Sequence, residues 1–240
     1  MLSDIFIIFD FIIGIFCLLT SLFLLINAIN TKKKVFYPFF LYFLLVSISL
    51  FLILVYVTEP NIGDQLGHVL ILLVILLTFI GDLALLVMTF FINKKITRNL
   101  IISETSITFF FLLLIFLFSS LDITSINGQI PNLFISDAAL LFLTYFTPNF
   151  FSILNLIHVD NNYTVFREKF SRNLIIFFIL GIFLTFGKIL SFFTIMINNS
   201  PVNLTYMDVF AILFIFQIFI IVYTIPINKN KDFALHYHGN

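Results

Sequence analysis

Charged side chains are scarce in this chain. Asp, Glu, Lys and Arg make up 10% of its 240 residues and hydrophobic residues 61%. An ordinary soluble domain has about 25% charged and about 45–50% apolar residues. The composition therefore excludes a soluble globular protein and indicates an integral membrane protein, with the lipid bilayer as its first partner.

Other absences exclude further classes of protein. The acidic and basic residues balance to a net charge of zero, so the composition does not indicate nucleic acid as a partner. The single cysteine, Cys17, rules out an intrachain disulfide. There is no P-loop, HExxH, GxSxG or Rossmann glycine pattern, no Cys/His cluster with metal spacing, and no paired-aspartate motif for intramembrane catalysis. We therefore expect neither an enzyme nor a bound metal or organic cofactor.

Seven apolar runs are long enough to cross a bilayer, which takes about 20 residues in a helix. Short polar connections separate these runs, and residues 228–240 form a short tail. We predict an all-α integral membrane protein with a seven-transmembrane helix bundle in residues 1–227. The predicted spans are residues 5–29, 36–57, 68–92, 104–121, 132–157, 173–197 and 207–227.

The basic residues predict the orientation of this bundle. Every Lys and Arg except Lys188 lies in the first, third or fifth connection or in the C-terminal tail. By the positive-inside rule these segments are cytoplasmic, which places the N-terminus outside and the C-terminus in the cytoplasm. The start, MLSD, has no basic region, so no removed signal peptide is expected. The pattern indicates a multi-pass protein of the plasma or cytoplasmic membrane.

Polar residues inside the spans recur at helical spacing, so that each set occupies one face of its helix. In lipid, such faces turn toward other helices or toward a cavity. The run 109-FFFLLLIFLF-118 has no polar side chain, and we place it at the periphery of the bundle. Gln217 is expected to hydrogen-bond to another helix. The main polar faces are Asp10, Gly14, Cys17 and Ser21; Thr78, Asp82 and Thr89; Asp137, Leu141, Thr144, Tyr145, Pro148 and Ser152; and Gly181, Thr185, Lys188 and Ser191.

The charges within these faces predict a ligand site. A charge at the bilayer centre costs about 2.5–3.5 kcal/mol, so Lys188 needs a partner. We favour Asp82, with Asp137 and Asp10 as alternatives, although Asp10 is also expected to reach the outer interface. All four charges lie at or outward of the middle of their spans, which predicts a polar cavity open to the outside. The predicted ligand-binding residues are Asp82, Lys188, Asp137, Thr185 and Tyr145, with Pro148 and Gly187 as hinges.

The layout resembles the seven-helix membrane input regions of microbial histidine kinases and other receptors. The features that carry the resemblance are the short loops, the outer N-terminus, the KKK after the first span and the NKKITRN after the third. The resemblance covers nearly the whole chain and implies a receptor or sensor in signal transduction. No output domain follows Ile227, so we expect signalling through a cytoplasmic or membrane protein partner, or through the spans themselves.

Two alternatives to a ligand-binding receptor remain open. Small carriers of the PQ-loop type, which transport sugars, are similar in having seven helices in a 3+1+3 plan, and a peripheral fourth span suits that plan. However, there is no Pro-Gln pair, and Thr147-Pro148-Asn149 is the nearest match. The chain would then be a transporter of a small solute or ion. In the third interpretation it is a non-catalytic scaffold subunit, whose buried charges only fix the packing of its helices.

Overall fold

The described part of the protein is entirely helical. The computed structural model describes residues 2–32, 36–58, 64–92, 97–118, 133–157, 172–185 and 213–222, and these contain no strand. The predicted all-helical fold is therefore confirmed for these residues. Their helices are α1 (Leu2–Thr31), α2 (Phe36–Thr58), α3 (Asp64–Ile92), α4 (Arg98–Phe118) and α5 (Leu133–Ile157), followed by two shorter helices, Arg172–Thr185 and Leu213–Val222.

Local chemistry explains where several helices begin and end. α1 ends at Thr31, and Lys32 follows with a φ of 54°, the left-handed conformation in which many helices terminate. α4 begins at Arg98, six residues before the predicted span. Thr97 caps it, because its side-chain oxygen accepts a hydrogen bond of 3.4 Å from the backbone N–H of Leu100. The polar stretch after Thr97 is thus the first turns of a helix.

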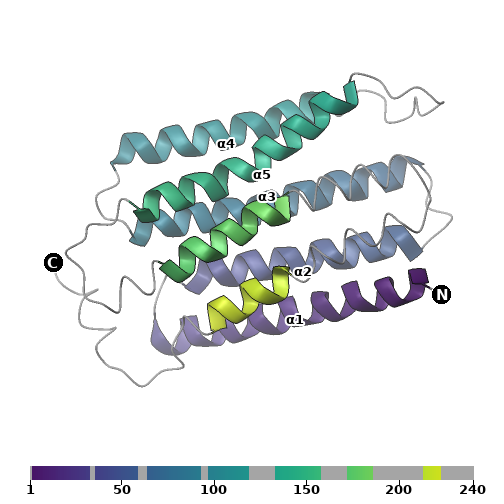
Figure 1. Ribbon diagram of the computed structural model, residues 1–240, viewed down its shortest axis with the longest axis horizontal. Helices are drawn as coiled ribbons and strands as arrows, with labels where there is room; N and C mark the ends of the chain where they lie inside the picture. Colours follow the sequence, from purple (N-terminus) through teal and green to yellow (C-terminus); the bar gives the residue numbers. More distant parts are fainter. Residues whose placement is uncertain are drawn as a thin grey trace.

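Most of the helices pack against their neighbours in sequence. α1 packs along α2 and α2 along α3, whereas α3 packs next against α5 and only marginally against α4. α4 lies at the edge of the bundle, where its main partner is α5 (Figure 1). The placement of this helix at the periphery agrees with the prediction from its apolar run.

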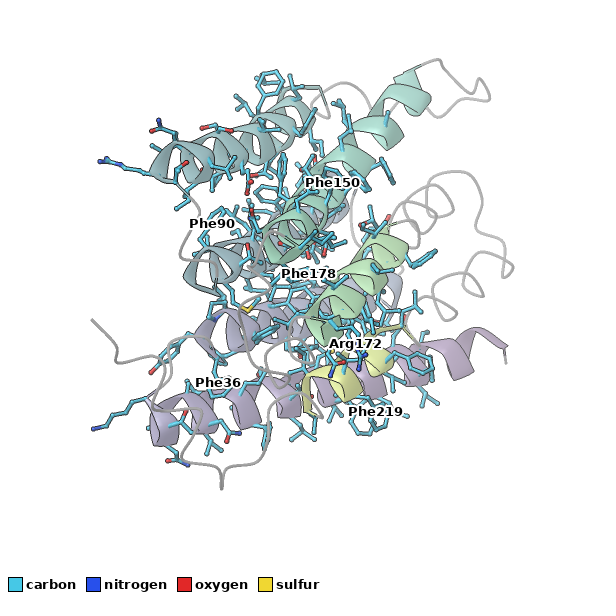
Figure 2. The ribbon with its side chains drawn as sticks, turned by 60° about the vertical axis from the view of Figure 1, so that its left-hand side comes forward. Phe36, Phe90, Phe150, Arg172, Phe178 and Phe219 are labelled. Atoms are coloured by element: carbon cyan, nitrogen blue, oxygen red, sulfur yellow. The ribbon has the colours of Figure 1, made fainter. Side chains whose placement is uncertain are left out.

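The 172–185 helix closes a ring with α2, α3 and α5. The ring of Phe177 packs edge-on against those of Phe39 and Tyr42 on α2, with centroid distances of 5.7 and 5.8 Å. At the other side, Gly181 lies against Asn149 of α5. Phe178, labelled in Figure 2, is fully buried in the same interior. Because α2 also packs on α3 and α3 on α5, these four helices surround a common interior.

Contacts between helices show that they alternate in direction. Thr78 of α3 meets Tyr145 of α5, and Thr89 of α3 meets Asn155 of α5, so α3 and α5 run parallel. Glu104 near the start of α4 also meets Asn155 near the end of α5, so these two helices are antiparallel.

One end of the bundle carries the basic side chains of the described residues. We call it the basic end and define it by Lys32, Arg98 and Arg172, all of them exposed. They lie just after α1 and at the starts of α4 and the 172–185 helix, on the left of Figure 1. The structure therefore brings together residues that the sequence places in three different connections.

Several helices have the length and the apolar surface of membrane spans. Four contain windows long and apolar enough to cross a bilayer, namely Ile7–Thr31, Phe36–Tyr56, Leu72–Phe90 and Arg98–Ile115. Three described helices or parts of helices are apolar but shorter: Phe142–Ile157, Arg172–Thr185 and Leu213–Val222. Large apolar side chains such as Phe11 and Phe16 on α1 and Phe219, at the lower edge of Figure 2, are exposed. Such a surface suits contact with lipid.

Candidate functional site

A buried group of polar side chains occupies the interior of the four-helix ring. We call it the polar core, and its members come from α2, α3, α5 and the two shorter helices. Each member is at least nine-tenths buried. The polar core consists of Tyr42, Thr78, Asp82, Tyr145, Asn149, Thr185 and Gln217.

Asp82 is the acidic member of the polar core. Its side chain is 4% exposed, on the face of α3 that also carries Thr78 and Thr89. The Asp82 carboxyl lies within electrostatic range of the hydroxyl groups of Tyr42 and Tyr145. These tyrosines belong to α2 and α5, so the acidic group interacts electrostatically with phenols from two different helices.

Close packing at Gly81 lets α2 approach this part of α3. A Cβ atom at Gly81 would lie 3.6 Å from the Cα atom and 3.3 Å from Cδ2 of Tyr42. The absence of a side chain at this position therefore holds Tyr42 against the turn of α3 that carries Asp82.

Tyr145 joins α5 to α3 through its hydroxyl group. This oxygen lies 2.7 Å from Oγ1 of Thr78 and donates to the backbone carbonyl of Ile75 at 3.2 Å. The phenol is buried and held at two points, so its position is fixed relative to α3. A ligand in this interior would meet an ordered hydroxyl group.

Gln217 connects its own helix, Leu213–Val222, to α2 and to the 172–185 helix. Its Oε1 accepts a hydrogen bond of 2.9 Å from the Tyr42 hydroxyl, and its Nε2 donates one of 3.0 Å to the carbonyl of Phe177. The prediction of an interhelical hydrogen bond at Gln217 is confirmed. The bond to Tyr42 also orients the phenol beside Asp82.

The 172–185 helix approaches α5 next to Pro148. A Cβ atom at Gly181 would overlap Oδ1 of Asn149. Asn149 donates from Nδ2 to the carbonyl of Tyr145 at 2.9 Å. Thr185 is buried one turn beyond Gly181 and donates to its carbonyl at 3.0 Å. The face predicted from Gly181 and Thr185 therefore does point toward α5.

Pro148 lies inside α5 without interrupting it. Proline has no N–H group, so the carbonyl of Thr144 receives no helical hydrogen bond from it. One turn farther along, Ser152 donates from its hydroxyl group to the carbonyl of Pro148 at 2.6 Å. The hinge function of Pro148 stays a prediction.

Three of the five predicted ligand-binding residues are buried in the interior of the bundle. Asp82, Tyr145 and Thr185 belong to the polar core. The backbone of Asp137 lies in α5, eight residues before Tyr145, or about 12 Å along the helix axis, and its side chain is outside the described part. Lys188 and the predicted hinge Gly187 also lie outside the described residues, so the pairing of Lys188 with Asp82 stays a prediction.

Two buried acidic residues add to the sequence analysis. The side chain of Asp10, eight residues after the start of α1, is 6% exposed. Its expected reach to the outer interface stays a prediction. Glu104 was not identified as a site residue, and its side chain is 4% exposed. Glu104 is the first residue of the predicted fourth span, and the polar residues around it are as typical of a loop as of a helix.

Among the described residues, the hydroxyl oxygen of Ser49 on α2 is buried and has no hydrogen-bond partner. Ser49 is two turns from Tyr42, on the same face of α2. Since buried hydroxyl groups are normally hydrogen-bonded, this oxygen is available to a water molecule or a ligand.

The described residues contain no group of three or more His, Cys, Asp or Glu side chains that could hold a metal ion. The polar core instead offers an acidic group, two phenols, an amide and hydroxyl groups. This chemistry suits hydrogen bonding to a small polar molecule or binding of a proton or cation. Comparisons with protein-family models, curated proteins and solved structures find no match to this chain.

Proposed function

We propose that the chain is a seven-span, receptor-like or sensor-like membrane protein that binds a small ligand or ion at the polar core. The observation that carries this proposal is the buried Asp82 carboxyl, on a turn of α3 that packs against Tyr42 and within electrostatic range of Tyr145. Ionisable groups inside membrane spans are costly and are usually retained for function. The four-helix ring gives this group an enclosed environment built from several parts of the chain.

The proposed topology has its N-terminus outside and its C-terminus in the cytoplasm. It is supported by the alternating directions of the helices and by the exposed basic residues at the basic end. In this orientation the basic end faces the cytoplasm. The described residues account for seven helices, four of them with windows long enough to span.

We further propose that Lys188 is the counter-ion of Asp82. Lys188 follows Gly181 and Thr185 at helical spacing, which assigns it to the same helical face. That face approaches α5 at Asn149. A ligand or proton would then act by changing the pairing of these charges, and α5 and the sixth span would move at Pro148 and Gly187.

A thermal-stability screen tests the proposed site. The purified protein is heated with a panel of inorganic ions and small polar metabolites, as wild type and as Asp82→Asn, Lys188→Met and Asp10→Asn variants. A ligand of the polar core raises the melting temperature of the wild type and of Asp10→Asn, because Asp10 lies on α1, outside the ring. Asp82→Asn and Lys188→Met lose the shift. A ligand that stabilises all four proteins equally would place its site elsewhere.

The second candidate function is transport, and the edge position of α4 favours it. In a 3+1+3 carrier the fourth helix is a linker, and here α4 packs on α5 and hardly on α3. The same residues would hold the substrate. Flux in proteoliposomes, measured with any ligand found in the thermal screen, separates a carrier from a receptor, because a receptor binds the ligand without moving it.

A further inference from the structure

A second buried acidic site lies at the basic end, separate from the polar core. Glu104 belongs to a stripe on α4 that turns inward although α4 is the outermost helix. The stripe consists of Glu104, Thr108, Leu112 and Ile115, and all four side chains are buried. Their spacing of four, four and three residues is that of one helix face.

Asn155 links this carboxyl group to two other helices. Its Nδ2 donates one hydrogen bond of 2.9 Å to Oε2 of Glu104 and another of 3.1 Å to Oγ1 of Thr89. The Thr89 hydroxyl itself donates to the carbonyl of Leu86 at 2.6 Å. The side chains of α3, α4 and α5 therefore meet at a single amide nitrogen.

No cationic side chain contacts Glu104 among the described residues. The nearest charged or titratable residues on α4 and on the helices packed against it are Arg98 on α4, Asp82 on α3 and Tyr145 on α5. Asp64 and His68 on α3 and Asp137 on α5 lie farther away along these helices. Arg98 is exposed and six residues away, on a different side of the helix. Asp82 and Tyr145 belong to the polar core, about 10–15 Å along their helices from Thr89 and Asn155.

A buried carboxylate without a counter-ion costs several kcal/mol, so such a group is neutralised by a proton or by a bound cation. The geometry favours the proton. The amide nitrogen of Asn155 donates to both Oε2 of Glu104 and Oγ1 of Thr89, so an N–H donor and not a metal ion meets the two oxygens. A carboxylic acid accepts at one oxygen and carries its proton on the other, which leaves Oε1 of Glu104 for the proton.

We propose that Glu104 is a proton-binding site, and that its neutral acid form joins α4 to α3 and α5 at the basic end. The proposal does not depend on the ligand of the polar core. It assigns a function to a buried acidic residue of α4 that the Asp82 site does not use.

Infrared spectroscopy of the purified protein at neutral pH tests this assignment, because a protonated carboxylic acid has a carbonyl stretch that a carboxylate lacks. We expect this band in the wild type and in the control Asp82→Asn, and its loss in Glu104→Gln. In Asn155→Leu the band should move, since the donor to Oε2 is gone. If Glu104→Gln fails to fold, Asn155→Leu serves as the test: a shifted band supports the assignment to Glu104, and an unshifted band contradicts it.

Two results would overturn the proposal. One is a band that is the same in the wild type and in both variants at this site. The other is a wild-type spectrum without a Glu104 band, together with a melting temperature that sodium or potassium raises in the wild type but not in Glu104→Gln. The second result would make the group a cation site.

Discussion

Replacing Gly181 with alanine is a sharp test of how the 172–185 helix packs on α5. The added Cβ atom would overlap Oδ1 of Asn149. The Asn149 side chain is 3% exposed and is held by its bond to the carbonyl of Tyr145, so it has little freedom to move aside. Overpacking of this kind costs about 1–3 kcal/mol.

Helix propensity acts in the opposite direction. Alanine is favoured over glycine in a helix interior by about 1 kcal/mol, so Gly181→Ala alone should lower the free energy of unfolding by about 0–2 kcal/mol. Removing the obstacle with Asn149→Ala should reverse the sign, and Gly181→Ala then stabilises the protein. The coupling energy between the two substitutions is expected to be about 1–3 kcal/mol.

The assay is equilibrium unfolding of the four proteins of this double-mutant cycle in mixed micelles. Gly14→Ala is the matched control, because its added Cβ would meet only the edge of the Phe51 ring, at 3.2 Å, and that side chain can give way. A coupling energy near zero between Gly181→Ala and Asn149→Ala would refute the close approach of the two helices, and with it the closed ring around the polar core.

Two further predictions concern buried side chains. Gln217→Leu removes the hydrogen bonds to Tyr42 and to the carbonyl of Phe177, and each should contribute about 0.6–1.7 kcal/mol to the free energy of unfolding. A Tyr42→Phe, Gln217→Leu double variant that loses the full sum of both single effects would contradict a direct bond between the two side chains. Cys17 has no exposed surface, so a maleimide should label it only after unfolding, and rapid labelling of the folded protein would show that α1 packs differently.

The hydropathy of the sequence predicts most of the helices because lipid demands a length and an apolar surface from each span. All seven described helices lie in or across the predicted spans. The faces carrying Thr78, Asp82 and Thr89, or Gly181 and Thr185, were predictable for the same reason, since a polar group in lipid must turn inward. Their burial agrees with that expectation.

The partners of these faces were not predictable in the same way. Tyr42 and Gln217 are 175 residues apart, and periodicity gives the direction of each side chain without the helix that it meets. Glu104 illustrates a second limit. A hydropathy window starts where the sequence becomes apolar, so the predicted span began at Glu104 itself and excluded the first turns of α4, although the helix begins after Thr97. Glu104 was therefore expected at a helix end, and it lies about two turns inside the helix.

The α3–α5 pair connects the two buried acidic sites physically. At one level Tyr145 bonds to Thr78 beside Asp82, and at another Asn155 bonds to Thr89 beside Glu104. The two levels are 10 residues apart on α5, or about 15 Å, and Pro148 lies between them. If α5 moves along α3 as one body, a displacement that breaks one contact also strains the other, and a ligand of the polar core changes the affinity of Glu104 for its proton. By linkage, the protonation of Glu104 then changes the affinity for that ligand by the same factor, whereas a hinge at Pro148 would uncouple the two sites. The infrared band of Glu104, recorded with and without a ligand found in the thermal screen, therefore reports whether the two sites act together.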